Sequence, residues 1–213
     1  MKKQLVLFVL LFCCFSCASQ KKEIISKSTI KLEGRNTNIR DLIEIDGYYS
    51  SSEYCNKGGT ILFEDGTWVA FSFKADLSED EIRANMSKSV NSWIEDKQIR
   101  RGNYWGVYKA ERDTVILYEY EKGTFWKGWS LYEYRYKILN RKTIQRIYIK
   151  SLLKRDESYY KNESPWREND SLSIFFPADS LPSSDCWLKE EKWIWRNEQD
   201  WKDYMQKIKQ KKK

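Results

Sequence analysis

The chain has 213 residues, of which 38 are lysine or arginine and 31 are aspartate or glutamate, and it contains no histidine. Without histidine, the Ser-His-Asp and Cys-His arrangements of hydrolases are excluded, together with the commonest general base near neutral pH and the commonest metal ligand. Ten tryptophans and fourteen tyrosines are available to fill or line a β-structured core.

The amino terminus has the layout of a secretory signal. Lys2 and Lys3 precede an apolar run from Leu5 to Phe15, which leads into Ser16 and Cys17. The alternative is a transmembrane helix, but crossing the hydrocarbon layer takes about 20 apolar residues, and this run is shorter. We therefore expect residues 1–17 to be a signal peptide that is removed on export.

The cleavage point resembles the lipobox of bacterial lipoproteins, in which a Leu-x-small triplet precedes a cysteine that becomes acylated. Cys14, Phe15 and Ser16 occupy the triplet here, and Cys17 follows. The resemblance implies lipid attachment at Cys17 and, because Ala18 comes next, an outer-membrane destination. Cleavage by an ordinary signal peptidase, which would give a soluble secreted product, is the alternative.

Removing residues 1–17 takes away Lys2 and Lys3, so 36 basic residues face 31 acids and the mature net charge is +5. Part of this excess lies in residues 207–213, of which five are lysine. Such a tail can favour anionic lipid, although its more common interpretation is a solvated terminus. Nucleic acid is not an expected partner of an exported protein.

A change in composition divides the mature chain. Residues 18–40 are mostly polar, and we expect them to form a tether between the membrane and the folded domain. From Glu44 onward, short aromatic and β-branched runs alternate with turn residues, which predicts an all-β domain over residues 41–213.

The clearest local signal is a hairpin over residues 60–73. Asp65 and Gly66 separate two apolar runs, and this dipeptide favours a type I′ turn with two positive φ angles. Val69, Phe71 and Phe73 share the face of the second run that should point at the core.

One helix is predicted to interrupt the strands. Ser78 and Glu81 have the spacing of a capping box. Four apolar residues then recur at helical spacing, and they should pack against the barrel or cover one of its ends: Ile82, Met86, Val90 and Trp93.

Four further strands are predicted at residues 104–110, 114–120, 129–138 and 143–151. The short polar turns between them force neighbouring strands to be antiparallel, as in an up-and-down meander. In the third of these strands, Tyr132, Tyr134 and Tyr136 lie opposite a charged face, so the tyrosines should point inward.

The end of the chain carries weaker signals. Residues 171–176 are predicted to form a strand, and residues 192–195 another short one. Asn197 can cap a final helix with four apolar residues on one stripe: Trp201, Tyr204, Met205 and Ile208.

With a strand at residues 46–49, the count reaches eight or nine, which predicts an antiparallel up-and-down β-barrel with two accessory helices, one of them C-terminal. The pattern resembles the lipocalin-like lipoproteins of gut and environmental Bacteroidetes. The resemblance covers most of residues 44–201 and rests on four stretches, at residues 47–49, 62–67, 105–108 and 187–201. It implies a fold and brings no functional residue with it.

Two cysteines remain beside Cys17 once the signal is removed, Cys55 and Cys186. An even pair in an oxidising compartment predicts a disulfide between them. Two unpaired thiols are the alternative, because the sequence does not give their separation.

The sequence favours a non-enzymatic, membrane-anchored barrel that binds a small hydrophobic ligand or a partner protein. An outer-membrane carbohydrate-binding module is the alternative, since exposed aromatic rings can stack on sugars. A glycosidase would need two acids across a cleft, and no pair stands out among the 31. No cofactor and no metal are expected, and the ligand-binding residues are not identified.

Overall fold

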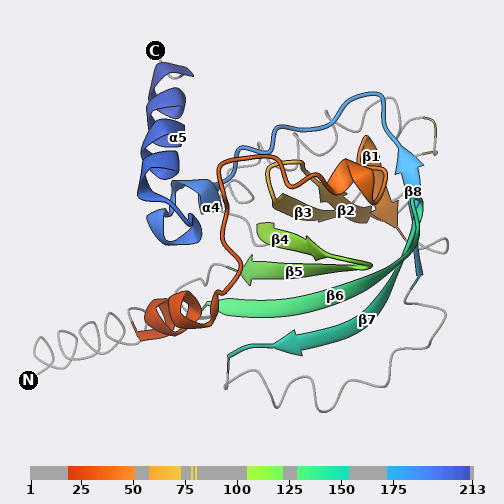
Figure 1. Ribbon diagram of the computed structural model, residues 1–213, viewed down its shortest axis with the longest axis horizontal. Coiled ribbons are helices and arrows are strands. Elements are labelled where there is room, and N and C mark those ends of the chain that lie inside the picture. Colours follow the sequence, from red (N-terminus) through yellow and green to blue (C-terminus); the bar gives the residue numbers. More distant parts are fainter. Residues whose placement is uncertain are drawn as a thin grey trace, which may run out of the picture.

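A computed structural model describes residues 19–50, 58–72, 78, 80, 105–121, 129–153 and 172–211 (Figure 1). These residues form a closed barrel in which each strand is antiparallel to the next and the last pairs with the first. The predicted fold class is therefore confirmed. The eight strands found in this part of the chain are β1 (Gly47–Ser50), β2 (Gly58–Leu62), β3 (Thr67–Ser72), β4 (Trp105–Glu111), β5 (Thr114–Glu121), β6 (Ser130–Asn140), β7 (Thr143–Ser151) and β8 (Leu172–Pro177).

The hairpin between β2 and β3 forms as predicted, but its turn differs. Gly66 has a φ of 88°, whereas Asp65 does not take a positive φ. The Gly66 amide donates to the Phe63 carbonyl at 3.1 Å, and the Phe63 amide donates to the Thr67 carbonyl at 2.9 Å. This is the pattern of a type I turn followed by a glycine bulge. The Asp65 carboxylate accepts from the Thr67 amide at 3.0 Å, which stabilises this turn over the type I′ form.

The alternation of side chains along the strands produces two separate apolar clusters. The inner cluster includes Tyr49, Leu62, Trp68, Tyr108 and Leu117, and partly buried Tyr134 and Tyr136 pack against it. The predicted inward orientation of the β6 tyrosines is therefore confirmed. Val69 and Phe71 belong to the other cluster, on the outer face of the barrel, and both are buried there. The expectation that this face of β3 points at a core is therefore confirmed for these two residues, and that core lies outside the barrel.

The residues expected to be a polar tether pack against the outer face of the barrel. Residues 19–27 are helical, and the side chains of Ile24, Ile30 and Leu32 are buried in the outer cluster. The Leu32 amide donates to the Ile194 carbonyl at 2.8 Å, which joins the two ends of the chain. The tether interpretation is therefore wrong for residues 19–40, and the folded domain begins before residue 41.

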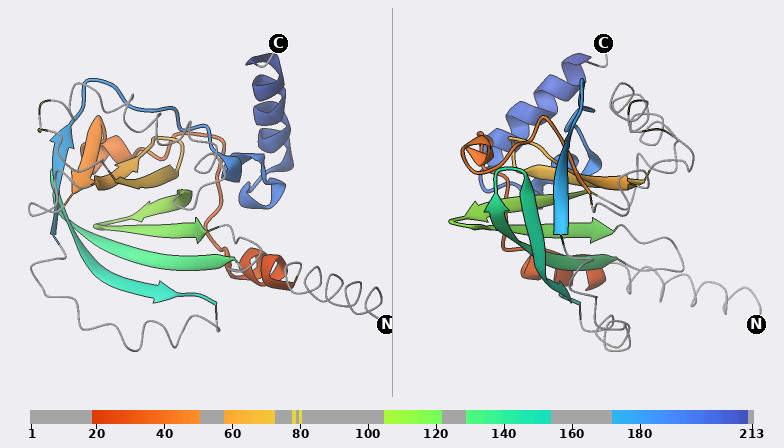
Figure 2. Two further views of the ribbon diagram at one scale, coloured as in Figure 1. Left: turned by 180° about the vertical axis from the view of Figure 1, so that it is seen from behind. Right: turned by 90° about the vertical axis from the view of Figure 1, so that its right-hand side faces the viewer.

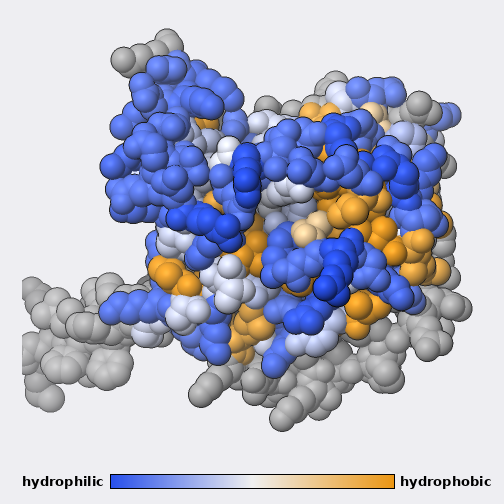
Figure 3. Space-filling model, in the orientation of Figure 1, coloured by the Kyte–Doolittle hydropathy of each residue, from blue (hydrophilic) through white to orange (hydrophobic). Residues whose placement is uncertain are grey.

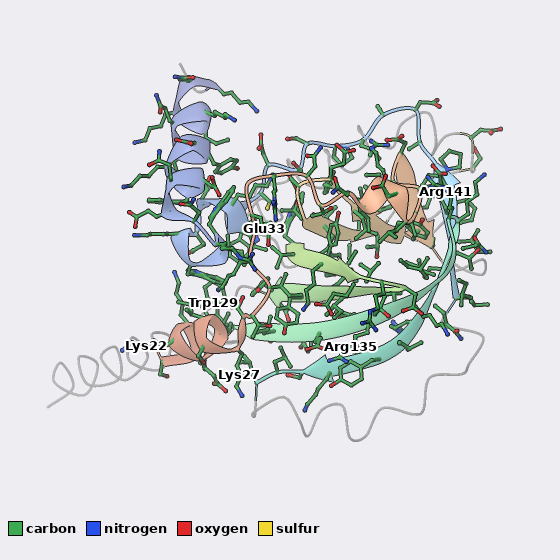
Figure 4. All side chains as sticks on the ribbon, in the orientation of Figure 1. Lys22, Lys27, Glu33, Trp129, Arg135 and Arg141 are labelled. Carbon is green, nitrogen blue, oxygen red and sulfur yellow. The ribbon has the colours of Figure 1, made fainter. Side chains whose placement is uncertain are left out.

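A short helix closes one end of the barrel. The 3-10 helix η1 (Ile39–Asp41) and the residues after it place Ile39, Ile43 and Ile45 in the inner cluster. Arg141, in the turn between β6 and β7, donates to the carbonyls of Asp41 and Arg40 at 3.2 and 3.0 Å (Figure 4). This end of the barrel is thus filled by apolar side chains.

The C-terminal segment begins with α4 (Trp187–Glu190) and η4 (Lys192–Ile194). Residues 192–194 are therefore a 3-10 turn and not the expected strand, although Trp195 forms a single bridge with Leu32. The final helix α5 (Glu198–Lys211) forms as predicted, with Asn197 Oδ1 accepting from the Gln199 amide at 2.8 Å. It stands apart from the strands in Figures 1 and 2. The helix predicted after Ser78, with its stripe from Ile82 to Trp93, lies outside the described residues.

Candidate functional site in the barrel interior

The inner surface of the barrel is not uniformly buried. Beside the buried inner cluster lie inward-facing side chains that are only partly buried, although they sit in the middle of long strands. They come from five strands: Ala70, Glu119, Tyr132, Tyr134, Tyr136, Arg146, Ile149 and Phe175. An eight-stranded barrel has room either for side chains alone or for one small ligand. The partial exposure makes this part of the interior the candidate place for such a ligand.

Polar groups are placed among the interior aromatics. Tyr136 pairs with Arg146 across β6 and β7, and Glu119 lies on the same inner face of β5. Burial raises the pKa of Tyr136, and the nearby Arg146, which hydrogen-bonds the phenol, opposes that shift. The interior therefore offers an aromatic wall with a cation, a carboxylate and phenol hydroxyls within it.

Trp68 fixes the shape of the wall on the opposite side. Its indole N–H donates to the Tyr118 carbonyl at 3.1 Å, and its ring meets Tyr134 edge-on, with centroids 6.2 Å apart. Gly106 makes this possible, since a Cβ there would lie 2.1 Å from the Trp68 Nε1. The absence of a side chain at Gly106 in β4 thus leaves room for the Trp68 ring.

Sequence reasoning identified the tyrosines of this site but not Arg146 or Glu119. A β-bulge shifts the pairing register of β6 and β7 between Arg135 and Tyr136. Because of this shift, the regular alternation of inward and outward side chains along β7 does not predict that Arg146 points inward as Ile149 does. Glu119 could have been found, because it shares the face of Val115 and Leu117 on an unbroken strand.

A second polar centre lies on the outside, at the tip of the β2–β3 hairpin. Asp65 Oδ2 lies 2.5 Å from Lys189 Nζ and accepts from the Ser184 hydroxyl at 2.6 Å. Burial acts to raise the pKa of Asp65, but Lys189, Ser184 and Thr67 together hold it below its usual value. Asp65 also borders a cavity of about 270 Å³ whose lining includes Asp200 and Asp203. A lowered pKa is the opposite of what a general acid needs, so this centre acts as a clamp between hairpin and C-terminal segment.

The tryptophans of the C-terminal segment also have structural partners. The indole N–H groups of Trp193, Trp195 and Trp201 donate to Glu191 Oε2, the Lys189 carbonyl and the Glu190 carbonyl at 2.9, 2.9 and 3.0 Å. Trp193 also meets Tyr120 edge-on, with ring centroids 5.4 Å apart. The three indole hydrogen bonds hold the C-terminal segment together, and Trp193 also attaches it to the barrel.

Of the three cysteines expected in the mature chain, Cys186 is the one that the structure describes. Cys186 is a buried free thiol at the start of α4, so the expected bond to Cys55 is not formed in this structure. Burial raises the pKa of the Cys186 thiol to about 12, and the side chain fills the outer cluster as a small apolar group. Cys55 and the expected lipid-attachment residue Cys17 lie outside the described residues.

No family model matches the sequence, and neither a curated protein nor a solved structure matches it. Within the described residues, no group of three or more acidic or cysteine side chains is arranged to hold a metal ion. No helix in the same part of the chain is long and apolar enough to cross a membrane.

Proposed function

We propose that the mature chain is a lipid-anchored protein of the cell envelope whose barrel holds one small amphipathic molecule. The observation that carries this proposal is the partial burial of inward-facing Tyr134, Tyr136, Ile149 and Phe175 in the middle of the sheet. An apolar body would lie against these side chains, and a polar group would meet Arg146, Glu119 or the phenols. Anchoring through acylated Cys17, with an outer-membrane location, rests on the resemblance of the signal to a lipobox.

A partner protein is the second candidate for what the barrel binds. Five large apolar side chains of β6, β7 and β8 are exposed. They are Leu139, Ile147, Tyr148, Leu172 and Ile174. A patch of this kind is typical of an interaction surface.

Two matched substitutions on β7 separate these candidates. Ile149 faces inward opposite Tyr134, whereas Ile147 is 54% exposed. Ile149→Trp adds bulk to the free part of the interior, and Ile147→Trp adds the same bulk outside. We expect residues 18–213 to brighten N-phenylnaphthylamine, a neutral dye that fluoresces in apolar sites, and Ile149→Trp to weaken dye binding by about tenfold or more.

The control variant Ile147→Trp should bind the dye as the parent does. Circular dichroism would show whether both variants are folded. If the dye does not bind the folded parent, or if only Ile147→Trp weakens its binding, the interior is not the ligand site and the outer surface becomes the leading candidate.

A further inference from the structure

The helix over residues 19–27 and α5 lie on the same side of the molecule. Both are at the left of Figure 1 and at the right of the rear view in Figure 2. The first described residue, Ser19, follows Cys17 by two positions, so an acyl anchor on Cys17 would attach at this side. We call it the anchor side.

The helix 19–27 is held rigidly against the barrel. Ile24 is fully buried, and the Ser28 hydroxyl is hydrogen-bonded to the Tyr120 phenol. Lys21 Nζ lies 2.9 Å from Glu191 Oε2, and Gln20 accepts from the Trp129 amide at 3.3 Å. A domain fixed this closely to its anchor cannot turn freely, so one side of it must face the bilayer.

The anchor side presents unpaired cations. Four exposed lysines of the two helices form no ion pair with any residue that the structure describes, and we call them the lysine set: Lys22, Lys27, Lys207 and Lys209. Figure 4 shows Lys22 and Lys27 directed away from the strands. Of the three acids of α5, Glu198 is paired with Lys192 and Lys202, at 2.7 and 3.2 Å. The other two, Asp200 and Asp203, line the cavity beside Asp65, which Lys207 also borders.

The surface of α5 on this side is polar. Figure 3 shows hydrophilic residues along its left flank, and α5 has no fully buried residue. The sequence continues past Lys211 with Lys212 and Lys213, which adds to the positive charge. A polar, basic surface suits phosphate headgroups and not insertion into the hydrocarbon layer.

We propose that the anchor side is a docking surface for an anionic lipid bilayer, on which the lysine set contacts the headgroups and fixes the orientation of the barrel. The proposal deepens the proposed function, since it rests on anchoring at Cys17 for its biological setting. The surface itself can be tested without the anchor.

The test uses residues 18–213, which lack Cys17, so its result does not depend on acylation. Sedimentation would measure binding to phosphatidylcholine vesicles with and without phosphatidylglycerol. We expect binding only to the anionic vesicles at low salt, with loss at high salt because the lysines are exposed. Each lysine near an anionic surface contributes roughly a factor of five, so changing all four lysines of the set to glutamine should weaken binding by roughly 600-fold.

A matched control removes four positive charges from the opposite side of the barrel, in the β4–β5 and β6–β7 turns and in the strands next to them. Its substitutions are Lys109→Gln, Arg112→Gln, Lys137→Gln and Lys142→Gln. Selective loss of binding in the lysine-set variant supports the proposal. Equal loss in both variants, greater loss in the control, or no binding by the parent protein at low salt would overturn it, and none of these results bears on acylation of Cys17.

Discussion

The Asp65 carboxylate links the β2–β3 hairpin to the C-terminal segment through Lys189 and Ser184. Its partner Lys189 is 6% exposed and Asp65 is 34% exposed, so the pair is largely withdrawn from water. Removing one member of such a pair leaves a buried charge without its counter-ion. We expect Asp65→Asn to lower the free energy of unfolding at neutral pH by about 2–4 kcal/mol, as measured by denaturant titration.

The pH dependence of that loss has a definite sign. The folded-state pKa of Asp65 lies below the usual value, so the ion pair stabilises the fold above the usual carboxyl pKa of about 4. This stabilisation disappears as the pH falls through the lowered folded-state pKa, and parent and Asp65→Asn should converge there. The exposed pair of Lys109 and Glu111 supplies the control, because solvent screens it and Glu111→Gln should leave the free energy of unfolding nearly unchanged. Equal effects of both substitutions at neutral pH would show that Asp65 is not a clamp.

At the level of secondary structure, the helix 19–27 is an element that the sequence did not reveal. Its apolar residues are few and stand among lysines and serines, so composition alone favours a tether. Burial of Ile24 comes from contacts with the distant C-terminal segment and the outer face of the barrel, which local pattern cannot show.

A substitution at Ile24 tests whether this helix belongs to the folded domain. Ile24→Ala should lower the free energy of unfolding by about 2–4 kcal/mol, because it leaves a cavity under a fully buried side chain. Lys22→Ala, on the exposed face of the same helix, should change it by less than about 0.5 kcal/mol. Thermal or denaturant unfolding of both variants would measure this difference, and a neutral Ile24→Ala would restore the tether interpretation.

The strands were predictable because two local signals agreed along most of the sheet. Alternating apolar residues marked the strands, and turns such as that containing Arg112 and Asp113 marked their ends. The errors arose where a hydrogen bond or a β-bulge, which the alternation of residues does not show, determines the backbone geometry. The Thr67 amide selects the turn form at Asp65, and the bulge near Tyr136 brings Arg146 into the interior.

In the whole molecule, the outer and inner apolar clusters have different structural roles. The outer cluster, which includes Cys186, holds both ends of the chain against the barrel, and the inner cluster includes the apolar residues of and after η1. In the proposed function, the partly buried side chains beside the inner cluster are where the ligand would lie.

Native mass spectrometry of the full chain, expressed in bacteria and extracted from their membranes, tests this account most directly. We predict a mass that corresponds to residues 17–213 with acyl groups on Cys17, and a non-covalent small-molecule adduct that is missing from Ile149→Trp. An unacylated mass without any adduct, from protein that is folded by circular dichroism, would contradict both the anchor and the ligand-holding barrel.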